Sequence, residues 1–318
     1  MSTSAPVSPA PTGPAPTRAA RVDHLTWGLA VANLVAQIGI IVTGGAVRLT
    51  GSGLGCSQWP LCEPGSFTPE FHAEMGIHPL IEFGNRTLTG VLGVIAVALV
   101  WAVYRREPTA ARPAPLRRLV WLPLIGIAVQ AVVGGITVWV DLHPAIVGSH
   151  MLISLALVAV STYLLLRLRA ADGEPVWRVE RPVRTIAGAL AVVGVVLLVL
   201  GVITTGAGPH SGDAEEAYRW ALDPASVSKL HAWAVWAFVA LVLAGLVLLR
   251  DAPAARRAWW VLLGVTLAQG AIGYVQYFTG LPELLVGAHM LGAALLVVSL
   301  VHALDALRTR ERAAVPSP

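Results

Sequence analysis

Residues 147–152 read Val-Gly-Ser-His-Met-Leu, and residues 286–291 read Val-Gly-Ala-His-Met-Leu. The match extends upstream without a gap at the same offset of 139 residues, so that Gln130 corresponds to Gln269. Each copy places one histidine near the start of a long apolar segment. An ionisable ring at membrane depth is costly, and it usually serves as a ligand, a proton relay or a cofactor contact. The duplication therefore predicts a repeated fold organised around these two histidines.

The composition indicates a polytopic membrane protein. Of the 318 residues, 56% are hydrophobic and 13% are charged, whereas soluble domains carry about 25% charged residues. The formal net charge is +4, but the arginines stand in short clusters beside apolar segments. They do not form the basic stripe that nucleic-acid binding needs. We therefore expect membrane lipid around the protein and no nucleic-acid partner.

Eight segments reach the length of about 20 apolar residues that a membrane-spanning helix requires. They cover approximately residues 25–47, 79–104, 117–140, 146–168, 183–205, 228–249, 258–278 and 285–307.

The basic residues predict the orientation of these segments. Eighteen of the 22 precede the first segment, follow the last, or lie in the loops after the second, fourth and sixth. The other four are Arg48, Arg86, Arg219 and Lys229. Because basic residues concentrate in cytoplasmic loops, we expect a multi-pass protein of the plasma membrane with both termini in the cytoplasm. Residues 1–22 lack the apolar core of a signal peptide and are expected to be a disordered cytoplasmic tail, with a second tail at 309–318.

The two halves of the chain repeat each other in the same orientation. Ile-Val-Thr-Gly at 41–44 corresponds to Ile-Thr-Thr-Gly at 203–206, at an offset of 162 that falls to 139 by the fourth segment. The fold class that we expect is an all-α integral membrane protein, with eight transmembrane helices as two tandem four-helix bundles. The bundles should cover residues 23–170 and 171–308. Such bundles hold cofactors between facing helices.

Histidines at the outer ends of the even-numbered segments are candidate ligands. They are His78, His150, His231 and His289. A buried histidine bonded to a backbone carbonyl explains any one of them equally well. His231 and His289 lie at matching depth in one bundle, and two facing imidazoles suit the axial positions of a haem iron. Zinc would require further cysteine or carboxylate ligands, and the missing Cys-x-x-Cys-His motif predicts a haem without thioether bonds. The remaining histidines, expected at the surface, are His24, His72, His143, His210 and His302.

The second segment carries an acidic residue at membrane depth. Its first residues, 78–86, read His-Pro-Leu-Ile-Glu-Phe-Gly-Asn-Arg. Aligned with the sixth segment, Asn85 falls on His231 and Glu82 falls on a serine. Glu82 and Arg86 are four residues apart on one helical face, so an ion pair is one interpretation. A carboxylate that is present only in the half lacking a second matching histidine favours a reaction site instead.

The loop after the first segment contains both cysteines of the chain. Residues 48–62 are rich in glycine, but no strand precedes them, so a nucleotide-binding loop is disfavoured. Cys56 and Cys62 lie on the oxidising side, where a disulfide is the expected state. A redox-active thiol pair is the alternative, since an exposed or strained bridge is labile.

Together these features resemble the haem A synthase family, membrane enzymes related to a mitochondrial cytochrome oxidase assembly factor. The resemblance covers about residues 25–307. It rests on the Gly-Ser-Gly-Leu-Gly-Cys…Trp-Pro-Leu-Cys loop, the Glu82-x-x-Asn85-Arg86 segment and the repeated histidine-bearing helices. It implies oxidation of the C8 methyl group of haem O to a formyl group, which yields haem A for cytochrome c oxidase. It also implies that a haem O synthase is a partner.

The resemblance assigns roles to individual residues. The second bundle would hold a b-type haem between His231 and His289, and the first would bind haem O, the substrate, through His150. Glu82 matches the proposed catalytic acid of the family, beside Arg86. Asn85 departs from the pattern, because the family carries an iron-ligating histidine there.

The departure at Asn85 leaves two arrangements open. His150 alone ligates the substrate iron and one position stays open, or His78 replaces the missing ligand. His78 lies seven residues before Asn85, about 10 Å further out along a helix, so the open position is favoured.

Two other functional classes compete with this enzyme. A non-catalytic bis-histidine b-type cytochrome would pass electrons, but it needs neither Glu82 nor the cysteine loop. A transporter would show helices broken near the membrane midplane, whereas these segments are mostly continuous. The electron acceptor is not identified by the sequence, and a homo-oligomer is compatible with it.

Overall fold

The computed structural model describes residues 22–70, 76–213 and 218–310. The eight long helical segments are α1 (His24–Leu49), α2 (His78–Arg105), α3 with α4 (Ala114–Leu119 and Trp121–Trp139), α5 (Pro144–Arg169), α6 (Arg181–Ala207), α7 (Pro224–Leu248), α8 (Pro253–Phe278) and α9 (Glu283–Asp305). All eight are long and apolar enough to cross a membrane. The predicted all-α membrane fold is therefore confirmed. The tails predicted for 1–22 and 309–318 lie almost wholly outside the described residues.

The structure differs from the predicted elements at the inner end of the bundle. The third segment begins with the separate short helix α3, and a 3-10 turn, η1 (Thr109–Ala111), precedes it. Two strands, β1 (Pro175–Trp177) and β2 (Arg308–Arg310), pair antiparallel. Neither strand was predicted, because three residues are too few to show the alternation that identifies a strand. The first residues of the predicted C-terminal tail are thus ordered.

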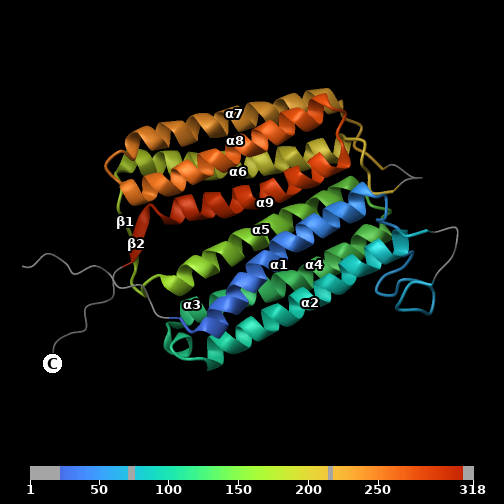
Figure 1. Ribbon diagram of the computed structural model, residues 1–318, viewed down its shortest axis with the longest axis horizontal. Coiled ribbons are helices and arrows are strands. Elements are labelled where there is room, and N and C mark those ends of the chain that lie inside the picture. Colours follow the sequence, from blue (N-terminus) through green and yellow to red (C-terminus); the bar gives the residue numbers. More distant parts are fainter. Residues whose placement is uncertain (1–21, 71–75, 214–217, 311–318) are drawn as a thin grey trace, which may run out of the picture.

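The helices gather into two groups that lie side by side (Figure 1). Helices α6 to α9 form one group, and α1, α2, α4 and α5 form the other. The groups meet where α9 packs against α1 and α5. The core of this junction combines Leu34 and Ile41 of α1 with Leu155 of α5 and Val297 of α9. Helix α9 thereby brings its histidine close to the first group.

Local signals explain where the helices begin. Proline occupies the first or second position of α2, α5, α6, α7 and α8, where its missing N–H leaves no intrahelical bond unmade. The Asp23 carboxylate accepts a hydrogen bond from Thr26 N at 3.1 Å, and Asp223 accepts one from Ser226 N at 2.9 Å. Hydrogen bonds from Ser226 hold the pKa of Asp223 below its usual value. These caps satisfy backbone donors that a helix start leaves free.

A buried arginine closes the inner end of the first group. Arg112 is 7% exposed and donates to the carbonyls of Leu168 and Ala170 at 3.0 and 2.7 Å. Its Nε atom donates to Asp172 at 2.6 Å. Arg112 therefore satisfies carbonyls at the end of α5 that the helix itself leaves unpaired.

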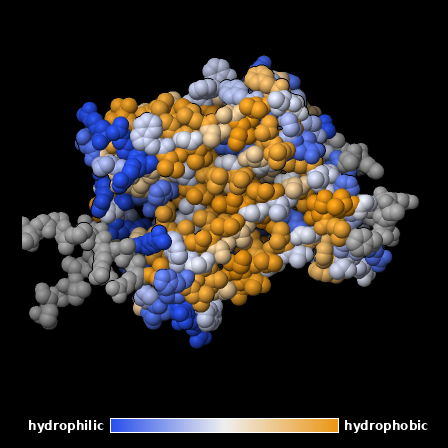
Figure 2. All heavy atoms as spheres, in the orientation of Figure 1, coloured by the Kyte–Doolittle hydropathy of each residue, from blue (hydrophilic) through white to orange (hydrophobic). Residues whose placement is uncertain are grey.

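Apolar side chains cover the middle of the visible face, and polar side chains gather at its two ends (Figure 2). The band matches the surface that a bilayer would cover. A backbone hydrogen bond of 2.8 Å, from Gly53 N to Gly212 O, joins the loop after α1 to the loop after α6. The outer ends of both groups are thus held together by backbone contacts as well as by helix packing.

Candidate functional site

A cavity of about 750 Å³ lies between the helices, near the ends of α1 and α6, and receives side chains from both groups. Four of the predicted site residues line it, namely Asn85 of α2, His150 of α5, His231 of α7 and His289 of α9. Most of the other lining residues are apolar. The single cavity therefore brings together the candidate residues of both halves.

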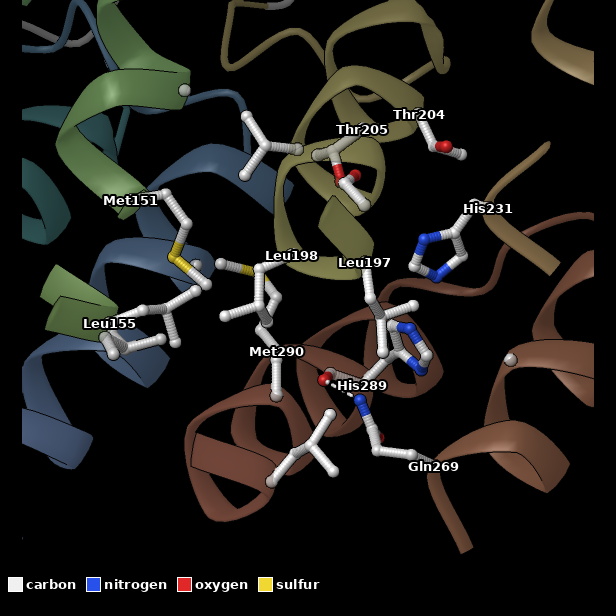
Figure 3. Close-up of a pocket in the computed structure, with 18 of the residues that line it drawn as sticks. Met151, Leu155, Leu197, Leu198, Thr204, Thr205, His231, Gln269, His289 and Met290 are labelled. Atoms are coloured by element: carbon white, nitrogen blue, oxygen red, sulfur yellow. Dashed lines mark hydrogen bonds between the residues drawn. The ribbon is translucent and has the colours of Figure 1, made fainter. Parts of the chain in front are cut away.

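The imidazole rings of His231 and His289 face each other inside this cavity (Figure 3). Their centroids are 6.4 Å apart, and the ring planes are inclined by 73°. Bonds between a metal ion and an imidazole nitrogen are about 2 Å long. Rings at this separation therefore leave room for one metal ion between them. The helices α7 and α9 hold the pair from different sides of the second group.

A glycine on the neighbouring helix faces each of the three histidine rings. A Cβ atom added at Gly201 would lie 3.1 Å from Cε1 of His231, and one at Gly273 would lie 3.2 Å from Cε1 of His289. A Cβ atom added at Gly134 would lie 3.4 Å from Cε1 of His150. Any larger residue would crowd the ring. The correspondence of Gly134 with Gly273 in the repeat was the sequence signal for this feature.

The three imidazole rings leave hydrogen-bonding capacity unused. None of the Nδ1 atoms of His150, His231 and His289 has a hydrogen-bond partner among the described residues, although all three are buried. The carbonyls of Leu197 and Gln269 interact with His231 and His289 at longer range. Each carbonyl belongs to the residue four positions before the facing glycine. In metal-bound histidines, the ring nitrogen that does not bind the metal usually donates to such an acceptor.

Two glutamines hold the helices that carry His150 and His289. Gln130 Nε2 donates to the carbonyl of His150 at 2.9 Å, and Gln269 Nε2 donates to the carbonyl of His289 at 2.8 Å. The sequence repeat contained both glutamines, but it did not assign them a role. They fix the axial position of each histidine relative to the facing helix.

Asn85 has different neighbours from His231. Its Oδ1 atom accepts a hydrogen bond from the Thr43 hydroxyl at 2.8 Å. His231 faces Gly201, whose counterpart in the repeat is Gly39 rather than Thr43. The two contacts are therefore displaced by about one helical turn. His78 does not line the cavity, and its Nδ1 atom lies 2.8 Å from the Ser52 hydroxyl.

Glu82 and Arg86 face the cysteine loop rather than the cavity. One Glu82 oxygen accepts a hydrogen bond from Cys56 N at 2.7 Å, and the other accepts one from Arg86 Nε at 3.0 Å. A second guanidinium nitrogen of Arg86 also contacts this oxygen. Arg86 donates further to the carbonyls of Gln58 and Leu61 at 2.8 and 3.0 Å. The ion-pair interpretation is thus realised, and the pair binds loop and helix together.

The predicted disulfide between Cys56 and Cys62 is present. Both cysteines are fully buried. The loop lies directly on the start of α2, since a Cβ atom added at Gly55 would lie 2.6 Å from the backbone of His78. Trp59 of the same loop packs against Gly135 and, edge-on, against Trp139 of α4. The bridged loop therefore covers the outer ends of α2 and α4, one helical turn from Asn85.

A family model described as cytochrome oxidase assembly protein matches residues 26–301. The Heme A synthase of Bacillus pumilus is 32% identical over 141 residues, which are 44% of this chain and 43% of that protein. The Heme A synthase of Shewanella oneidensis is 31% identical over 159 residues, 46% of each chain. That of Bacillus licheniformis is 26% identical over 181 residues, 57% of each chain. The matched regions span about half the length of these relatives.

Proposed function

Because the chain belongs to the cytochrome oxidase assembly protein family, we propose that it is a haem A synthase that oxidises the C8 methyl group of haem O to a formyl group. The observation that carries this proposal is the pair formed by His231 and His289. Their rings lie 6.4 Å apart inside the cavity and would hold a haem iron between them. A b-type haem bound there would supply an electron relay.

The residues of the first group support a second haem site, which would receive haem O. His150 lines the cavity, and its ring rests on Gly134 as the other two rings rest on their glycines. Asn85 lines the cavity as well but is held by Thr43. We therefore assign His150 as the ligand of the substrate iron and leave the opposite position open. The bond from His78 to Ser52 disfavours His78 as a replacement.

Oxidation of a methyl group to a formyl group removes electrons and protons from one carbon atom, and water supplies the oxygen. Glu82 is the proposed proton acceptor. It lies one turn before Asn85 on α2, and its carboxylate is bound by Arg86 and Cys56 N. The disulfide-bridged loop would exclude bulk water from the start of α2.

The same proposal includes location and partners. We place the protein in the plasma membrane with both termini in the cytoplasm, which puts the cavity near the outer face. A haem O synthase would supply the substrate, and an electron acceptor would complete the reaction.

Haem analysis tests the proposal directly. The full chain is expressed with a haem O synthase, and haems are extracted and separated by chromatography. Haem A or a hydroxylated haem O is the expected product. Haem B with unconverted haem O, in cells containing folded protein, would contradict the enzyme and favour an electron-transfer cytochrome. His231→Ala and His289→Ala should each remove the b haem, and an unchanged low-spin spectrum in either variant would contradict the ligand assignment.

A further inference from the structure

The largely apolar cavity carries two cationic side chains, Arg48 and Lys229. No aspartate or glutamate of the described residues lines it. Positive charges beside a low-dielectric space favour the binding of an anion there.

Arg48 is the stronger of the two indications. It stands in the last turn of α1, and one guanidinium nitrogen donates to the carbonyl of Thr205 on α6 at 3.1 Å. Its Nε atom is buried and makes no hydrogen bond to any described residue. A buried donor without a partner is costly, so the guanidinium of Arg48 has hydrogen-bonding capacity that the described residues leave unused.

Lys229 also lines the cavity, near the start of α7. It is the single lysine of the sequence, and it is exposed at the mouth of the cavity, two residues before His231 on α7. The Thr204 hydroxyl lies 3.4 Å from the carbonyl of Val227, which joins α6 to this part of α7. Arg48 and Lys229 therefore both lie near the end of α6.

The other two outer basic residues have different contacts. Arg86 is bound to Glu82 and the cysteine loop. Arg219 donates to the carbonyl of Pro209 at 2.7 Å and does not line the cavity. Arg48 and Lys229 thus differ from Arg86 and Arg219 because their side chains line the cavity.

We propose that Arg48 and Lys229 bind the carboxylate side chains of the haem that His231 and His289 hold. The inference rests on the proposed function, because it requires a haem between these histidines. Charge-assisted bonds from a guanidinium and an ammonium group to carboxylates are strong and directional. Arg48 belongs to the first group of helices, so the haem site of the second group is completed by α1.

The test compares two ligands on the purified, apo full-length protein in phosphatidylcholine nanodiscs. Haem b carries free carboxylates, and its dimethyl ester does not. Titrations followed by absorbance give the affinity of each. We expect the wild-type protein to bind the acid about a hundredfold more tightly than the ester, since each of the two charge-assisted bonds contributes a factor of about ten. Arg48→Gln and Lys229→Gln should each reduce this preference, and the double variant should abolish it.

Matched variants separate charge from structure. Arg219→Gln removes an outer arginine that lies away from the cavity and should keep the wild-type preference. Arg48→Lys should restore part of it. The low-spin haem spectrum should be unchanged throughout, which shows that the histidines still ligate.

Equal affinity of the wild-type protein for acid and ester would overturn the proposal while leaving the haem site intact. A preference for the acid that disappears when anionic phosphatidylglycerol is added would assign the cations to lipid phosphate and would also overturn it. By contrast, unaltered haem binding by His231→Ala would refute the underlying haem assignment itself.

Discussion

Replacing Glu82 with glutamine perturbs the polar cluster that joins α2 to the disulfide-bridged loop. In the wild-type protein, the two carboxylate oxygens accept hydrogen bonds from two different donors, Cys56 N and the guanidinium of Arg86. A glutamine amide has a single acceptor oxygen. Its NH2 group, which donates, would occupy the position of the other carboxylate oxygen. The variant should therefore lose a hydrogen bond to the loop or to Arg86.

The expected loss of stability depends on the hydrogen bonds that Arg86 keeps in the variant. A hydrogen bond to a charged group contributes about 1.5–3 kcal/mol. Removing one partner of a buried ion pair costs about 3–5 kcal/mol when the other charge is left without any partner. That larger cost does not apply to Arg86. Arg86 keeps its bonds to the carbonyls of Gln58 and Leu61, and its side chain is 20% exposed. Opening of the loop should therefore become about tenfold to a hundredfold more frequent.

Reduction of the Cys56–Cys62 bond reports on this opening, because both sulfur atoms are buried when the loop is closed. The intact protein is exposed to a phosphine, and free thiols are alkylated and counted by mass spectrometry over time. Glu82→Gln should be reduced about tenfold to a hundredfold faster than wild type. Glu70→Gln, a change at an exposed residue of the same loop, should not differ. A wild-type reduction rate in Glu82→Gln would refute the reasoning.

A second readout of the same position separates loop binding from chemistry. Glu82→Ala should keep the spectrum of the b haem and abolish formyl production in cells that also contain a haem O synthase. If this variant releases the loop but still makes normal haem A, Glu82 binds the loop and is not the proton acceptor.

Three further variants test the site and the fold. Gly273→Ala adds a Cβ atom 3.2 Å from the facing imidazole, so strain of about 1–3 kcal/mol should weaken b haem binding about tenfold or more in an absorbance titration. Gly264→Ala, where no atom lies within 4 Å of the added Cβ, should bind as wild type does. Arg112→Ala removes the bonds that close the end of α5 and should lower the melting temperature, unlike Arg250→Ala, whose side chain is 79% exposed; equal melting temperatures for the two variants would contradict this role. His150→Ala should retain the b haem but fail to retain added haem O, and co-purification of haem O at the wild-type level would count against His150 as its ligand.

Sequence reasoning predicted the elements of the fold well because their signals are local. A span needs about 20 consecutive apolar residues, and eight such segments could be counted directly. The repeat exposed His150 and His289 together with the two glutamines that now prove to hold their backbones. The two cysteines, close together in one loop, predicted the disulfide that the structure contains.

Contacts between side chains of different helices were harder to predict from the sequence. The alignment of the halves equated Asn85 with His231, but the two residues meet their neighbouring helices about one turn apart. Glu82 was predicted as a reacting group, and its carboxylate faces the loop. Arg48 was read as one of the basic residues that indicate topology, although its side chain crosses to α6 and lines the cavity.

The sequence by itself therefore determined the number of spans, the duplication, and which residue types stand at the outer ends of the helices. The tertiary structure alone decided that glycines on α6 and α8 face the imidazoles of α7 and α9, and that one cavity joins the two halves. Hydrophobicity and helical periodicity are properties of a single segment. The axial shift and rotation of one helix against another depend on how side chains from distant segments pack, and that information is not contained in any one stretch of the chain.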